Sequence, residues 1–178
     1  TFGTGLKTWL KADSLAGIAN GGLVSTLVDS SGNNNNAIQA TSTKQPAYTQ
    51  NVLNGNPVLR FVAANSQTMT VSTNFPAPTT VIYVSKLNGG TNARMLSGLS
   101  NNWLLGYHGG LRQRAYFVGW LNESVSAAVN TSPYIYTGTI GGSGVNSTFY
   151  ENGTNLVSSQ GGVTGPNGLS FSGYTATS

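Results

Sequence analysis

The residues of this chain best suited to chemistry lie between positions 103 and 120, where several aromatic side chains occur near two arginines. Tyr107, Arg112, Arg114 and Tyr116 combine two ring surfaces with two planar hydrogen-bond donors. Aromatic rings stack on apolar ligand surfaces, and guanidinium groups bind hydroxyl and acid groups through directed hydrogen bonds. These four residues are therefore candidates for ligand binding.

Their placement depends on a predicted β-hairpin in which Gly109-Gly110 forms a favoured two-residue turn between strands 103–108 and 111–120. The expected cross-strand pairs are His108–Leu111, Tyr107–Arg112, Leu105–Arg114 and Trp103–Tyr116. An unbroken register places the four candidates side by side on one face. Two interpretations stay open: this face binds a ligand, or it packs into the core through Trp103, Leu105, Val118 and Trp120 while the arginines cap it.

The acidic residues do not suggest catalysis. The chain has four, namely Asp13, Asp29, Glu123 and Glu151, and no two have the close spacing that pairs carboxylates in retaining glycoside hydrolases. There is no cysteine, His108 is the only histidine, and no nucleophile elbow joins a strand to a helix. We therefore expect that the protein is not an enzyme.

A metal site is conceivable only in the polar segment that begins at Asp29. Asp29 and Asn33 offer hard oxygen ligands of the type that calcium takes. The alternative is that Asp-Ser-Ser-Gly-Asn simply forms a turn, which we favour because calcium sites usually draw on several carboxylates. We therefore expect no cofactor, with calcium at Asp29 and Asn33 as the one metal alternative.

Composition narrows the class of protein. Charged residues make up 7% of the 178 residues, against about 25% in average proteins, and Gly is abundant with 24 residues. The net charge of +4 comes from scattered Lys and Arg side chains, without the patch that nucleic-acid binding requires. No apolar run approaches the roughly twenty residues of a membrane span. We expect neither nucleic acid nor membrane as a partner.

The pattern of short apolar runs and Gly- or Asn-rich turns predicts strands throughout and no amphipathic helix. The predicted strands cover 6–12, 23–28, 58–62, 69–72, 79–87, 94–99, 103–108, 111–120, 134–140, 147–151, 154–158 and 169–172. The run 79–87 is almost continuously β-branched or aromatic, which indicates a strand covered on both faces. The expected core residues are Leu59, Phe61, Ile82, Val84, Phe117 and Phe149.

Several segments carry a family resemblance. They read Trp-Leu-Lys-Ala-Asp at 9–13, Asp-Ser-Ser-Gly-Asn at 29–33, Gln-Pro at 45–46, Asn-Gly-Asn-Pro-Val-Leu-Arg-Phe at 54–61, and a strand–Asn-Gly–strand hairpin at 149–157. Together they resemble the concanavalin A-like, laminin-G-like jelly-roll family from about Leu6 to about Gly173. The resemblance implies an all-β, two-sheet antiparallel jelly-roll β-sandwich forming one domain over 1–178. The family usually continues with one more apolar strand, which could lie in a removed part, come from a partner, or be dispensable here.

The resemblance also implies functions. Relatives occur as accessory domains of secreted bacterial proteins, as adhesion modules, and as decoration or fibre domains of phage particles. We expect a non-catalytic module on an extracellular or virion surface that binds glycans through Tyr107, Arg112, Arg114 and Tyr116. The alternatives are a purely structural decoration domain that contacts a capsid or fibre protein or a second copy of itself, and, less favoured, a glycoside hydrolase.

Overall fold

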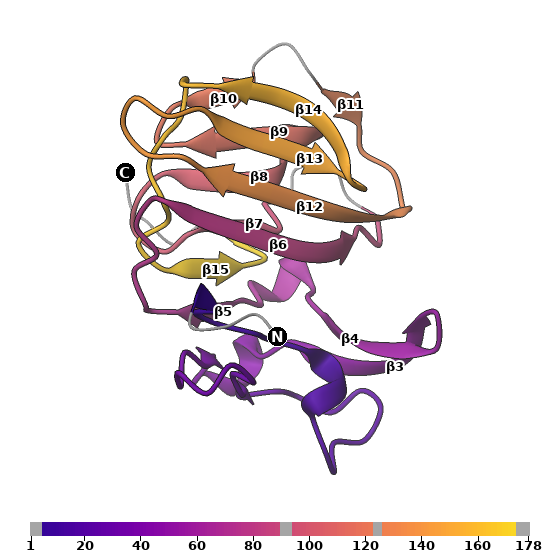
Figure 1. Ribbon diagram of the computed structural model, residues 1–178. Helices are drawn as coiled ribbons and strands as arrows, with labels where there is room; N and C mark the ends of the chain where they lie inside the picture. The colour runs from indigo at the N-terminus through magenta and orange to yellow at the C-terminus, as the bar shows by residue number, and fades with distance from the viewer. Residues whose placement is uncertain (1–4, 90–93, 123–125, 174–178) are drawn as a thin grey trace. The chain divides into compact units, whose positions relative to one another are not determined.

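The computed structural model describes residues 5–89, 94–122 and 126–173, and its regular structure is almost entirely antiparallel β-sheet (Figure 1). The helical elements in the described residues are the three-residue 3-10 turns η2 (Ala12–Ser14), η3 (Ser42–Lys44) and η4 (Ala63–Asn65). The all-β, antiparallel class is therefore confirmed. The contacts divide the chain into two compact units, Thr1–Ser72 and Thr73–Ser178, called here the N-terminal and C-terminal units. A single domain over 1–178 stays a prediction.

The N-terminal unit contains a hairpin and a small sheet. Strands β3 (Ala47–Leu53) and β4 (Asn56–Arg60) pair around Asn54 and Gly55, whose φ angles of 49° and 78° match the predicted Asn-Gly turn. Three very short antiparallel strands form the sheet, in the order β1 (Thr26–Leu27), β2 (Ala37–Ile38) and β5 (Met69–Val71).

The prediction of a strand over 6–12 is wrong. This segment alternates between partly buried and exposed residues as expected, but its ladder contact is one isolated bridge, from Leu10 to Asp29. The Asp29 carboxylate accepts the backbone N–H of Trp9 at 2.7 Å, in place of the carbonyl of a neighbouring strand. The chain then turns into η2 directly after Lys11.

The C-terminal unit contains two antiparallel sheets. The front sheet has the order β14 (Thr154–Ser159), β13 (Ser147–Glu151), β12 (Pro133–Ile140) and β6 (Thr79–Lys86). The back sheet has the order β15 (Leu169–Phe171), β7 (Leu96–Gly98), β8 (Trp103–His108), β9 (Leu111–Phe117) and β10 (Trp120–Asn122), and β11 (Ala127–Ala128) also pairs with β9. In Figure 1 strands β12–β14 of the front sheet lie in front of strands β8–β10 of the back sheet.

Close contacts between the two sheets form the core of the C-terminal unit. Phe117 and Phe149 are fully buried, as predicted, and Phe117 stacks on Trp103 with ring centroids 5.1 Å apart. At Gly138 of the front sheet an added Cβ would lie 2.9 Å from Cζ of Phe117, so only glycine lets the sheets approach this closely. The arrangement is sandwich-like, with apolar side chains of both layers meeting between them.

The other four predicted core residues are not fully buried. Ile82 and Val84 are 64% and 58% exposed, so the expectation that this strand is covered on both faces is wrong. The opposite face of β6 points inward, because Tyr83 enters the core and donates a 2.5 Å hydrogen bond to the carbonyl oxygen of Leu105. Leu59 and Phe61 of the N-terminal unit are only partly buried.

Candidate functional site

A β-bulge in the hairpin of β8 and β9 decides where the four predicted ligand-binding residues point. The register near the turn is as predicted, with His108 opposite Leu111 and Tyr107 opposite Arg112. At Gln113, whose φ is +64°, β9 gains one extra residue. Beyond it the predicted pairs are wrong by one position, because Arg114 pairs with Gly106, and Tyr116 with Leu104.

The bulge splits the four residues between two faces of the back sheet. Tyr107 shares the inner face with Leu105 and Trp103, and is 1% exposed. Its ring meets that of Tyr136 of the front sheet edge to face, 5.3 Å away. The expectation that Tyr107 lies on an exposed surface is therefore wrong.

Arg112 also points toward the front sheet. Its guanidinium forms an ion pair with the Glu151 carboxylate and lies over the ring of Tyr134, 4.4 Å from the centroid. Gln113 donates a second hydrogen bond to the same Glu151 oxygen at 2.7 Å. The hydrogen bond with Glu151 raises the pKa of Arg112. Through these contacts Arg112 of the back sheet binds residues of the front sheet, so its role is structural.

Arg114 and Tyr116 lie on the outer face, where they join two aromatic residues. The Arg114 guanidinium lies 4.4 Å from the centroid of the Trp120 ring, a cation–π contact. Tyr116 meets Trp120 edge to face at 5.0 Å, and the imidazole of His108 lies 5.7 Å from the same indole. We call these four residues, His108, Arg114, Tyr116 and Trp120, the outer aromatic cluster. All four are partly exposed.

The electrostatics of this cluster favour a neutral histidine. Burial lowers the pKa of His108, and the positive charges of Arg94 and Arg114 lower it further. At neutral pH its imidazole can therefore donate one hydrogen bond and accept another. The cluster thus offers ring surfaces, a guanidinium and a neutral imidazole in one place, which suits polar ligands with apolar faces.

Sequence reasoning placed Trp120 on one face with Arg114 and Tyr116, as the structure has it, but missed His108 as a neighbour of that group. The predicted register put His108 on the opposite face from Arg114. No residue type in Arg-Gln-Arg marks a bulge, because Gln113 is not a residue that usually takes positive φ. The Gly109-Gly110 turn was the one local signal available, and it fixes the register only as far as the bulge.

Asp29 is held by hydrogen bonds within the N-terminal unit. Its Oδ1 accepts the backbone N–H groups of Trp9 and Ser31, and its Oδ2 accepts the Ser31 hydroxyl and the Asn35 N–H. Burial alone would raise its pKa, but these four hydrogen bonds outweigh burial and lower it to about 2. Both oxygens are thus already occupied, which favours a structural role for this carboxylate.

Asn33 also serves the turn, since its side-chain amide donates to the carbonyl oxygens of Leu6 and Lys7. Among the described residues, no group of three or more His, Cys, Asp or Glu side chains could hold a metal ion. The absence of a cofactor stays a prediction.

The described carboxylates lie apart in the chain. Asp13 in η2 is exposed beside Lys11, Asp29 holds its turn, and Glu151 is engaged in β13. Glu123, the fourth acid considered for hydrolysis, lies outside the described residues.

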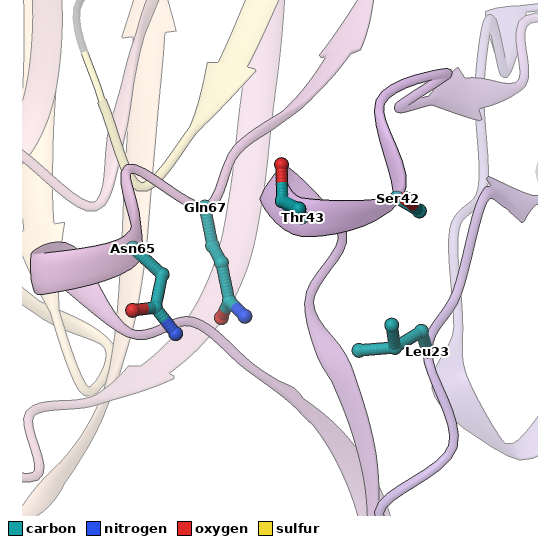
Figure 2. Close-up of a pocket in the computed structure, with 5 residues that line it drawn as sticks. All are labelled: Leu23, Ser42, Thr43, Asn65 and Gln67. Atoms are coloured by element: carbon teal, nitrogen blue, oxygen red, sulfur yellow. The ribbon is translucent and has the colours of Figure 1, made fainter.

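A shallow pocket of about 420 Å³ lies within the N-terminal unit. Figure 2 shows Asn65 and Gln67 on one side of it and Leu23 and Ser42 on the other, with Thr43 also lining it. The Gln67 side-chain oxygen accepts the backbone N–H of Val62 at 2.7 Å and so braces the pocket wall. The lining has no aromatic ring and no charge, so it offers a ligand less directional contact than the outer aromatic cluster.

The chain matches no family model, no curated protein and no solved structure. No helical element in the described part of the chain is long and apolar enough to cross a membrane. The fold and the outer aromatic cluster by themselves define the class of protein: an all-β antiparallel fold with an aromatic and basic surface on one sheet.

Proposed function

We propose that the chain is a non-catalytic module that binds carbohydrate through the outer aromatic cluster. Its fold would be the jelly-roll β-sandwich of the concanavalin A-like, laminin-G-like family. The sandwich-like C-terminal unit and the family motifs support this proposal. The location it implies is extracellular or on a virion surface, where the partner is a host or environmental glycan.

The observation that carries this proposal is the arrangement around Trp120. An indole packed beside a tyrosine and a guanidinium is oriented by its neighbours, so little side-chain entropy is lost when a sugar ring stacks on an exposed part of the cluster. Arg114 and His108 can bond the sugar hydroxyls or an acid group on the sugar. Tyr107 and Arg112 support the surface from beneath and make no contact with the ligand.

A glycan array tests the proposal. The chain should bind a defined set of glycans, and Trp120→Ala should lose that binding while keeping its circular dichroism spectrum. Trp9→Ala removes an indole of the N-terminal unit that is 46% exposed, and serves as the matched control. A chain that binds no glycan, or whose binding survives the loss of Trp120, would contradict this assignment.

A second candidate function is structural decoration, in which the module packs on a capsid or fibre protein. One observation favours it: Ile82, Val84 and Ile135 lie on the outer face of the front sheet and are 64%, 58% and 47% exposed. Val84 and Ile135 are direct cross-strand partners, so these side chains form one apolar patch. Replacing Ile82 and Val84 with Thr would abolish assembly under this alternative and leave glycan binding intact.

A further inference from the structure

Five buried polar atoms without a hydrogen-bond partner gather at one end of the space between the two sheets of the C-terminal unit. They are Ser85 Oγ, Tyr107 OH, Arg112 Nε, Tyr136 OH and Glu151 Oε2. These five residues are called here the inter-sheet cluster. They account for most of the unpartnered buried side-chain atoms found in the described residues.

Pairing and ring contacts bring the five together. Tyr136 of β12 is the cross-strand partner of Glu151, and Tyr107 of β8 is the partner of Arg112. The Arg112–Glu151 ion pair and the Tyr107–Tyr136 ring contact connect these two pairs across the space between the sheets. The Ser85 hydroxyl is close enough to Tyr107 to affect the pKa of that phenol. The cluster is therefore one site, built from the five strands β6, β8, β9, β12 and β13.

Their proximity does not satisfy these atoms among themselves. Although the hydroxyls of Ser85, Tyr107 and Tyr136 lie near each other, none makes a side-chain hydrogen bond of acceptable geometry in the described structure. A buried polar group without a partner costs about 1–3 kcal/mol, and native proteins carry only a few per hundred residues. Several such groups in one place indicate that they share a partner from outside the chain.

The chemistry of the cluster specifies that partner. Arg112 Nε can only donate and Glu151 Oε2 can only accept, whereas the three hydroxyls can do both. An oxygen that both donates and accepts, as in water or an alcohol, complements this set. The partner should be neutral, because Arg112 and Glu151 already balance each other and a further charge would be buried without compensation.

We infer that the inter-sheet cluster is a binding site for neutral hydroxyl oxygen, filled either by ordered water or by the hydroxyl group of a small polyol. Two to four polar partners are what a buried water molecule usually requires, and the cluster supplies them. The bound oxygen joins the front sheet to the back sheet beside the Arg112–Glu151 pair. This site is separate from the outer aromatic cluster, which lies on the other face of the back sheet, so it does not depend on the proposed carbohydrate binding.

The first test measures thermal unfolding of Tyr107→Phe and Tyr136→Phe, with the partly exposed Tyr150→Phe as control. If the hydroxyls share a bound oxygen, each core variant should lower the melting temperature by about 2–4 °C, and the double variant should lose less than the sum. If the hydroxyls have no partner, the phenylalanine variants should melt at or above the parent temperature. That second result would overturn the proposal.

The second test identifies the source of the oxygen. A high-resolution crystal structure grown without polyols should show density among the five atoms that refines as water, if water is the partner. Glycerol and myo-inositol are then titrated while the melting temperature is followed. A polyol site would raise the parent's melting temperature more than that of the Tyr107→Phe/Tyr136→Phe variant, whereas equal shifts assign the site to water. A crystal structure with no density, and with the hydroxyls bonded to each other, would refute the site.

Discussion

Arg112 and Arg114 lie two residues apart in β9 and point to opposite faces of the back sheet. Arg112 pairs with Glu151 of the front sheet, and Arg114 lies over Trp120 on the outer face. The bulge at Gln113 separates them by taking up one residue without a ladder partner. Two residues of the same type in one strand therefore have different roles, one in the stability of the fold and one at its surface.

Arg112→Ala should destabilise the protein strongly. Glu151 is 8% exposed, so removing its partner leaves a buried carboxylate without its counter-charge. Breaking a buried pair in this way costs roughly 3–5 kcal/mol. Urea denaturation followed by tryptophan fluorescence measures the loss, and the exposed Arg60→Ala in β4 is the control. A cost equal to that of Arg60→Ala would show that the pair does not join the sheets.

Arg114→Ala should reduce glycan binding with little effect on stability. The guanidinium sits on a partly exposed surface, so we expect a stability change of at most about 1 kcal/mol. The loss of a charge-assisted hydrogen bond to a ligand should weaken binding about tenfold or more. Calorimetric titration with the best glycan from the array gives this number. Arg114→Lys should recover only part of the affinity, because an ammonium cannot bond a ligand bidentately.

Stability should fall in acid because of Asp29. The folded-state pKa of about 2 lies below the ordinary value of 3.8, so the carboxylate stabilises the fold above pH 3.8 and this contribution is lost as the pH falls toward 2. The shift corresponds to roughly 2 kcal/mol. Urea midpoints measured between about pH 6 and pH 2 should show this loss, and Asp29→Asn should flatten that part of the profile. An unchanged profile in Asp29→Asn would exclude Asp29 as the cause.

Chelation should leave thermal stability nearly unchanged. Both oxygens of the Asp29 carboxylate are engaged with protein donors, so a calcium ion would have to displace existing hydrogen bonds. We expect equal melting temperatures with a calcium chelator and with added calcium. A rise of many degrees with calcium, abolished in Asp29→Asn, would instead establish the metal site at Asp29 and Asn33.

Val118→Asn should stabilise the protein. Val118 has a φ of +58° and is 49% exposed in the turn between β9 and β10. A β-branched residue is strained in this conformation, whereas asparagine tolerates it, and little packing is lost at an exposed site. We expect a gain of about 1 kcal/mol in the free energy of unfolding. The same substitution at Val145, also exposed, is the control and should have a smaller effect.

The turns and most strands were predictable from local sequence, although 6–12 is not a strand and β3 (Ala47–Leu53) was not predicted. Gly109-Gly110 and Asn152-Gly153 adopt the positive φ angles that a type I′ turn requires, because these residues accept such angles at little cost. Three of the strands that flank them begin and end within one residue of the predicted limits, since β-branched and aromatic runs between such turns have few other conformations. The predicted strand 111–120 is instead divided, because β9 ends at Phe117 and β10 begins at Trp120. The all-β class follows from this local information alone.

Tertiary packing decided which side chains face the core. In β6 both faces are apolar or aromatic, so the alternation could not select between Ile82 and Tyr83. Tyr83 points inward because its hydroxyl donates a hydrogen bond to the carbonyl oxygen of Leu105, whereas the side chain of Ile82 is exposed to solvent. The bulge at Gln113 likewise brings Arg112 to Glu151, 39 residues away, and leaves Arg114 outside. These choices depend on partners that are distant in the chain, and so no local pattern contains them.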